Sequence, residues 1–102
     1  MRRFRLTERA KTDVHGIWDY IAVTGGNLPA ADRQMVTFYD KFALLASQPL
    51  LGQLREDLRP DLRVFSAESY VILYYPTNGG IEVVGVAHGA QDIEAMYRAD
   101  ER

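Results

Sequence analysis

The sequence predicts an α+β fold in which an antiparallel helical hairpin packs on one side of a curved, mostly antiparallel sheet. Apolar residues recur at helical spacing between residues 10 and 45, and after Gly52 the pattern changes to short β-rich runs. Strands that are segregated from helices along the chain are typical of the α+β class. The expected order is β-α-α-β-β-β, and AQDIEAMY at residues 90–97 can form a short final helix.

The first predicted elements are a strand at residues 4–6 and the helix that follows it. Thr7 is a good helix N-cap, and Glu8 suits the first turn because the helix dipole favours a carboxylate there. One apolar stripe then recurs at helical spacing: Ala10, Val14, Ile17, Trp18 and Ile21. The sequence TGG at residues 24–26 is expected to end this helix.

A second helix is predicted from Asn27, which can cap it, with Pro29 in the first turn. Its apolar stripe steps by four and three residues: Ala31, Met35, Phe38, Phe42 and Leu45. Pro49 and Gly52 are expected to end it. Because few residues separate the two helices, they are predicted to form an antiparallel hairpin.

Three strands are predicted in the second half of the chain, at residues 63–65, 70–75 and 81–88. The last two flank the sequence PTNGG, in which Asn-Gly is a strong β-hairpin signal. Strict alternation along the last strand predicts that Val84 and Val86 face the core beneath the helices. The same alternation assigns Ile81, Val83, Gly85 and Ala87 to the opposite face, which the helices would leave open.

Length and composition narrow the class of protein. The chain has 102 residues, of which 25% are charged, and this fits one soluble domain spanning residues 1–102. The sequence has no cysteine, no signal peptide and no membrane span, so a cytoplasmic protein is expected. It has no HExxH motif, zinc-ligand spacing or nucleotide-binding loop, so neither a metal nor a cofactor is expected. A net charge of −2 argues against direct nucleic-acid binding.

Three stretches resemble the ParE toxins of bacterial type II toxin–antitoxin modules, within the broader RelE/ParE superfamily. They are LTERAKTDVHGIWDYI (residues 6–21), QPLLGQLREDLRPDLRVF (residues 48–65) and YVILYYPTNGGIEVVGVAHGAQDI (residues 70–93). In this order and spacing they cover nearly the whole chain. The resemblance implies the same α+β fold, growth inhibition, and a cognate ParD-like antitoxin that wraps the toxin and neutralises it in a hetero-oligomeric complex.

The resemblance implies two alternative activities. ParE-like members block DNA gyrase by protein–protein binding and stabilise its cleaved complex, whereas RelE-like members cleave mRNA on the ribosome. The acidic composition and Gly85 favour gyrase inhibition, since Gly85 stands where many relatives of both kinds carry an outward arginine. That glycine also prompts a third hypothesis, a toxin-fold binding partner whose toxicity is weak or lost.

The candidate site residues follow from these alternatives. RNA cleavage needs an acid, a base and cations, and Arg63, His88 and Tyr74 are the candidates for those catalytic roles. Gyrase inhibition predicts no catalytic residue, and His88 is then a structural residue at a strand end. Arg55, Arg59 and Arg63 are the candidates for binding the target, and the alternative is that they pair with Glu56, Asp57 and Asp61.

The antitoxin is expected to dock on the second helix. Beside its core stripe, this helix carries a second apolar set made of Val36, Tyr39, Ala43 and Leu44. A helix that buries only one stripe does not need so many apolar residues elsewhere, so this set is a candidate interaction surface. The alternative is that these residues pack against the sheet or against a second copy of the chain.

Overall fold

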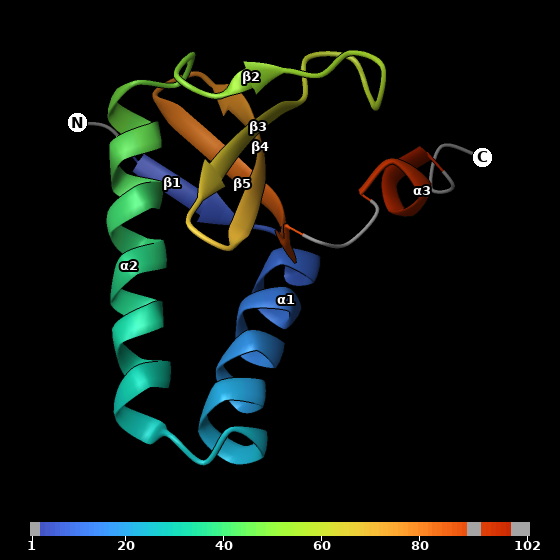
Figure 1. Cartoon of the computed structure of the whole chain (residues 1–102). Helices are drawn as coiled ribbons and strands as arrows, with labels where there is room; N and C mark the ends of the chain where they lie inside the picture. Colours follow the sequence, from blue (N-terminus) through green and yellow to red (C-terminus); the bar gives the residue numbers. More distant parts are fainter. Residues whose placement is uncertain (1–2, 90–92, 99–102) are drawn as a thin grey trace.

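The computed structural model describes residues 3–89 and 93–98, and it confirms the α+β class. A helical hairpin lies against a five-stranded sheet (Figure 1). The elements in order are β1 (Arg3–Leu6), α1 (Glu8–Asp19), η1 (Tyr20–Thr24), α2 (Leu28–Ser47), β2 (Gln53–Leu54), β3 (Arg63–Ala67), β4 (Tyr70–Thr77), β5 (Gly80–His88) and α3 (Ile93–Arg98). Within the described part of the chain, every helix is too short or too polar to cross a membrane.

The sheet joins the two ends of the chain. Its strand order is β1-β5-β4-β3-β2, and β1 runs parallel to β5, with Arg3 opposite Gly80 and Leu6 opposite Val83. The other neighbouring strands are antiparallel, as predicted. Strand β2 was not predicted, because a two-residue strand carries no periodic signal in the sequence.

Both predicted helix starts are confirmed by their caps. Thr7 Oγ1 accepts a hydrogen bond from the Ala10 amide at 3.1 Å, and Asn27 Oδ1 accepts one from the Ala30 amide at 3.1 Å. The first helical segment ends at TGG, as predicted, but its last turn is π-helical, because α1 continues into η1 before Gly25. The Gly25 amide closes that turn on the Tyr20 carbonyl oxygen at 2.8 Å.

One face of the sheet, which we call the helix-covered face, packs against α1 and α2. The predicted stripe of α2 supplies much of its core, since Ala31, Phe38, Phe42 and Leu45 are all buried. The Phe38 and Phe42 rings are nearly parallel, with centroids 6.3 Å apart. From the sheet, Ile72, Tyr74, Ile81, Val83 and Val86 join the same cluster.

The predicted alternation along β5 is wrong in its first half. Leu73 lies opposite Gly85 and Tyr74 lies opposite Val83, so the pairing with β4 skips Val84. This extra residue is a β-bulge, and it shifts the side-chain alternation by one position. Ile81 and Val83 therefore lie in the helix-covered core together with Val86, whereas Val84 packs on the opposite face.

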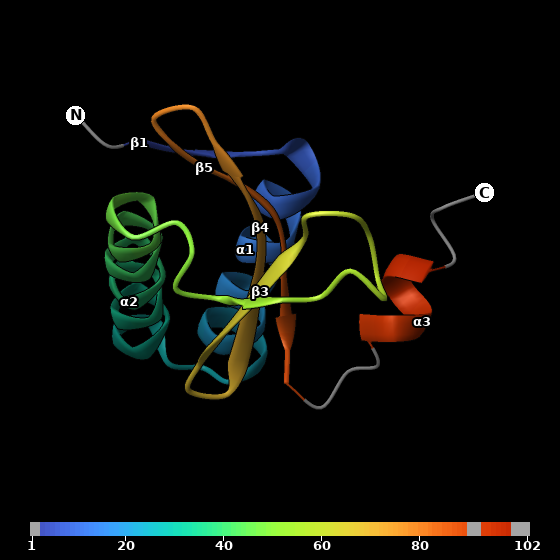
Figure 2. The same cartoon turned by 90° about the horizontal axis from the view of Figure 1, so that it is seen from above.

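The opposite face is closed rather than open, which corrects the expectation from the sequence. We call it the loop-covered face, because residues 55–62 and α3 cover it. Leu58, Leu62, Leu73 and Tyr97 form its buried cluster. Figure 2 shows the sheet between α2 on one side and α3 on the other. The sheet is thus enclosed from both sides.

Candidate functional site

The strand position at Gly85 is occupied by a tyrosine from α3. The Tyr97 side chain is only 1% exposed, and its hydroxyl lies where a Cβ atom of residue 85 would stand. Any side chain at residue 85 would therefore require Tyr97 to move. The glycine allows α3 to pack closely against the sheet.

Two arginines nevertheless lie next to this position. The guanidinium carbon of Arg9, from α1, lies 4.6 Å from the centroid of the Tyr97 ring. The guanidinium carbon of Arg59 lies 5.1 Å from the same centroid, and Arg59 also donates to the Tyr97 carbonyl oxygen at 3.4 Å. Such cation–π contacts are worth about 0.5–1 kcal/mol where they are exposed. Positive charge near residue 85 thus comes from α1 and from the segment 55–62.

Arg55 ties the segment 55–62 to α3. Its guanidinium donates to both carboxylate oxygens of Asp57, at 2.9 and 2.8 Å, and to Glu94 at 3.3 Å. The hydrogen bond to Asp57 raises the pKa of Arg55, and burial opposes this effect. The anticipated pairing of Arg55 with an acidic neighbour is therefore present, and much of its hydrogen-bonding capacity is used within the chain.

Arg63 and Tyr74 hold the turn between α2 and β2. Arg63 donates to the carbonyl oxygens of Leu50 and Gly52, at 3.1 and 2.7 Å. The Tyr74 hydroxyl donates to the Pro49 carbonyl oxygen and accepts from the Gly52 amide, each at 2.8 Å. Burial raises the pKa of Tyr74. Both side chains therefore have structural partners.

His88 lies far from Arg63 and Tyr74 along the sheet. In the strand register Arg63 faces Tyr74, while His88 faces Tyr70, four residues earlier on β4. At about 3.3 Å per residue, this places the two pairs about 13 Å apart along the strand. His88 is exposed, and its ring packs edge-on against Tyr70 with centroids 5.5 Å apart. The three candidate catalytic residues do not come together.

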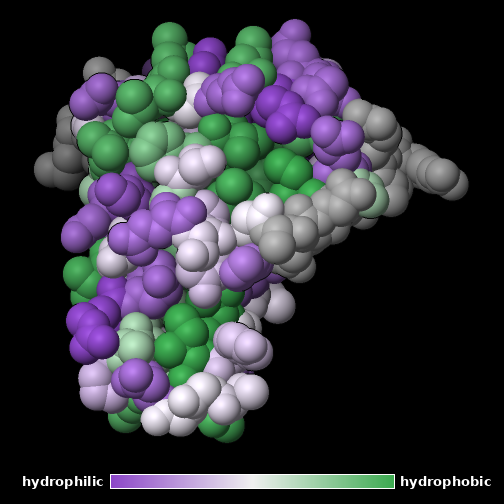
Figure 3. Space-filling view, in the orientation of Figure 1, coloured by the Kyte–Doolittle hydropathy of each residue, from purple (hydrophilic) through white to green (hydrophobic). Residues whose placement is uncertain are grey.

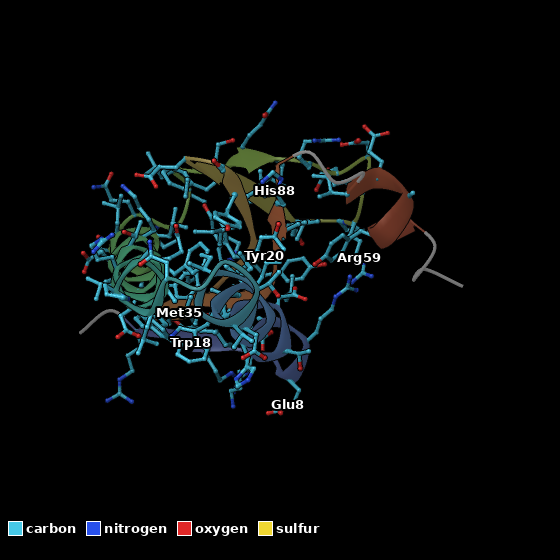
Figure 4. The ribbon with its side chains drawn as sticks, turned by 60° about the horizontal axis from the view of Figure 1, so that its bottom comes forward. Glu8, Trp18, Tyr20, Met35, Arg59 and His88 are labelled. Carbon is cyan, nitrogen blue, oxygen red and sulfur yellow. The ribbon has the colours of Figure 1, made fainter. Side chains whose placement is uncertain are left out.

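The residues suggested for antitoxin binding lie on and beside the outer surface of α2. Val36, Tyr39 and Ala43 are exposed, whereas Leu44 is half-buried. A shallow groove of about 310 Å³ runs alongside, between α1 and α2, and Trp18, Met35 and Tyr39 contribute to its lining. Trp18 and Met35 lie next to each other between the helices (Figure 4). The surface is thus wider than the sequence suggested, because α1 contributes to it.

A second exposed apolar group lies at the turn that Arg63 and Tyr74 hold. Leu50, Leu51 and Leu54 are large and exposed. Hydrophobic residues gather at this upper end of the molecule and again along the helical hairpin (Figure 3). This exposed group was not predicted, since PLLG at residues 49–52 was expected only to end the second helix.

Comparison with known proteins identifies the family. Residues 4–93 match the family described as the ParE toxin of the type II toxin–antitoxin system parDE. The chain belongs to the ParE toxin family. The resemblance seen in the sequence is therefore confirmed.

Curated relatives of this ParE-family chain align with it over almost their whole length. Toxin ParE1 of Caulobacter vibrioides is 31% identical over 97 residues, covering 93% of this chain and 97% of the relative. Toxin ParE1 of Mycobacterium tuberculosis is 28% identical over 93 residues, covering 90% and 94%. Among solved structures, the chromosomal ParDE TA system from P. aeruginosa aligns with a TM-score of 0.69 at 17% identity. It covers 86% of this chain and 96% of that one, and it supports the fold.

Proposed function

We propose that this ParE-type toxin inhibits DNA gyrase by binding it, and that a cognate ParD-like antitoxin neutralises the toxin in a hetero-oligomeric complex. Membership of the ParE toxin family carries this proposal. A net charge of −2 also favours a protein target over a nucleic acid. The protein acts in the cytoplasm, where gyrase and the antitoxin are found.

The geometry of the former catalytic candidates supports binding over RNA cleavage. Arg63 and Tyr74 are hydrogen-bonded to the backbone of residues 49–52 and lie at a distance from His88. A general acid–base pair must reach one substrate position together. The residues around His88 include Asp13, a carboxylate that would repel a phosphate.

For the gyrase contact we retain Arg59 as the first candidate among the three arginines. Arg59 lies with Arg9 over Tyr97, on the surface formed by α1, the segment 55–62 and α3. That surface combines two guanidinium groups with a buried aromatic ring.

The decisive experiment is a supercoiling assay with purified gyrase and the toxin free of antitoxin. We expect loss of supercoiling with accumulation of cleaved DNA, reversed by the antitoxin. Arg59→Ala should weaken inhibition by about tenfold, as loss of one good interface contact does, and Arg33→Ala on the exposed surface of α2 is the matched control.

Normal supercoiling, together with ribosome-dependent mRNA cleavage that His88→Ala abolishes, would favour the RelE-type activity. Absence of growth arrest would indicate a toxin whose activity is lost.

Antitoxin binding is tested with two exposed valines. Val36, on the proposed surface of α2, is 62% exposed, and Val23, in η1, is 71% exposed. Because both side chains face solvent, replacing either with aspartate should leave the fold intact. We expect Val36→Asp to weaken the antitoxin complex at least tenfold and Val23→Asp to leave it unchanged. Equal affinities for the two variants would move the antitoxin contact elsewhere.

A further inference from the structure

A pocket of about 570 Å³ lies between the end of α1 and the sheet. Asp13 and Gly16 of α1, Tyr20 of η1, Tyr70 of β4 and His88 of β5 line it. We call it the Tyr20–His88 pocket. Tyr20 and His88 lie near each other on the same side of the molecule (Figure 4).

Aromatic rings form much of the pocket wall. Tyr70 and His88 pack at an interplanar angle of 79°, and Tyr20 is 67% exposed beside them. Burial raises the pKa of Tyr70, and the neighbouring Tyr20 adds to the effect, which is consistent with two tyrosines that share one small space. Aromatic rings arranged around a space attract cations through the negative potential of their faces.

Asp13 supplies a fixed negative charge to this pocket. Its Oδ2 atom accepts a hydrogen bond from the Val86 amide at 3.0 Å, which anchors the carboxylate between α1 and β5. Among the described residues, its Oδ1 atom has no hydrogen-bond donor. An anchored carboxylate with one unused oxygen favours a cationic ligand that can donate hydrogen bonds.

Two features of the backbone keep the pocket open. Gly16 stands inside α1, where glycine destabilises a helix by about 0.5–1 kcal/mol relative to alanine, and a Cβ atom there would have no neighbour within 4 Å. The missing side chain thus widens the pocket. Tyr20 is the first residue of the π-helical turn, and such turns are frequent at functional sites.

From these observations we propose that the Tyr20–His88 pocket binds a lysine or arginine side chain presented by a partner protein. The carboxylate of Asp13 would receive the charged group, and the rings of Tyr20, Tyr70 and His88 would surround it. The methylene stem would lie on Ile17, which is half-buried in the same pocket. An anion would be repelled by Asp13, and a purely apolar ligand would leave the Oδ1 atom of that carboxylate without water or another hydrogen-bond donor.

The test is a titration of the ¹⁵N-labelled full chain with N-acetyl-arginine amide and N-acetyl-lysine amide, followed by NMR. N-acetyl-citrulline amide is the neutral control, since it has nearly the shape of the arginine probe without its charge. We expect saturable shifts of the Gly16, Tyr20 and Val86 amide signals, with a dissociation constant on the order of millimolar for so small a ligand. The citrulline probe should give no such shifts.

Asp13→Asn is the sharpest variant, because the amide oxygen can still accept from Val86 while the charge is gone. It should weaken binding of both cationic probes about fivefold or more. Asp19→Asn is its matched control, since Asp19 is a carboxylate of the same helix that pairs with His15 and lies outside the pocket. The control should bind as the unmodified chain does.

Three results would each overturn the proposal: no shifts with either cation, equal shifts with citrulline, or equal affinities for Asp13→Asn and Asp19→Asn. The titration contains neither gyrase nor antitoxin. A failure here therefore leaves the proposed function intact, and an inactive toxin would not affect the result.

Discussion

The two faces of the sheet are both closed, but by different means. On the helix-covered face, Phe38 and Phe42 of a long helix pack against the sheet in a large cluster of buried aliphatic and aromatic side chains. On the loop-covered face, Leu58 and Leu62 of an irregular segment and Tyr97 of a six-residue helix cover the sheet. The guanidinium groups of Arg9 and Arg59 lie against the Tyr97 ring. Packing on the helix-covered face relies on apolar residues that repeat along α2. Packing on the loop-covered face relies on a few individual side-chain contacts.

This difference has energetic consequences. Burying a large apolar side chain stabilises a fold by about 1.5–3 kcal/mol, whereas an exposed ion pair adds about 0.2–1 kcal/mol. The contacts of Arg55 with Asp57 and Glu94 are of the second kind. We therefore expect the helix-covered face to determine global stability and the loop-covered face to open locally, at lower free energy.

The largest effect is expected from Phe42→Ala. Phe42 is fully buried, and its ring packs against Phe4, Phe38 and Tyr39. Its truncation should lower the free energy of unfolding by about 3–5 kcal/mol. Urea denaturation followed by circular dichroism measures this change. A loss below about 1 kcal/mol would show that the helix-covered face is not the dominant core.

Tyr74→Phe tests the link between the two faces. Tyr74 belongs to the helix-covered core, and its hydroxyl holds the turn that leads toward the loop-covered face. Removing this hydroxyl leaves the buried Gly52 amide without its acceptor, so we expect a loss of about 1–3 kcal/mol. Tyr75→Phe, on the opposite face of β4, is the control and should change the unfolding free energy by less than about 0.5 kcal/mol. Equal losses would mean that the turn is not held by this hydroxyl.

Gly85→Ala acts on the loop-covered face alone. The added methyl group would overlap the Tyr97 hydroxyl, so Tyr97 and α3 should move away from the sheet. We expect a stability loss of about 1–2 kcal/mol, and hydrogen exchange should speed up in residues 93–98 but not in α2. Gly16→Ala is the control, because its methyl group meets open space and should raise helix stability. Unchanged exchange in α3 would contradict the tight packing of Tyr97 on Gly85.

The smallest effect concerns pH. Burial raises the pKa of Tyr70 and Tyr74 above the ordinary value of 10.0. The folded state thus holds these protons more tightly than the unfolded state, and the resulting stability is present below about pH 10 and lost as the pH rises through the folded-state pKa. Denaturation between about pH 9 and 11 should show a falling stability, and the fall should be shallower in Tyr74→Phe. An identical slope in both proteins would exclude a contribution from Tyr74.

The same contrast explains how much the sequence could predict. Caps, stripes and the hairpin turn are local signals, and they predicted the fold class, both long helices and four strands correctly. The bulge at Val84 could not be predicted, because alternation assumes one residue per pleat. Tyr97 and Gly85 come together only through tertiary packing, and neither residue stands in a local sequence pattern that signals this contact. The covering of the loop-covered face was therefore not predicted. The roles of Arg63 and Tyr74 also depend on a turn whose path has no periodic signal.

The parallel pairing of β1 with β5 has a consequence for synthesis of the protein. Leu6 pairs with Val83, and β5 lies between β1 and the rest of the sheet. A nascent chain that ends after β4 can form the helical hairpin and the β3–β4 pair, but its first strand has no neighbour to bond with. The sheet can be completed only after β5 has left the ribosome, and this long-range step closes almost the whole chain into one loop. Translation products that stop before β5 therefore lack the folded toxin.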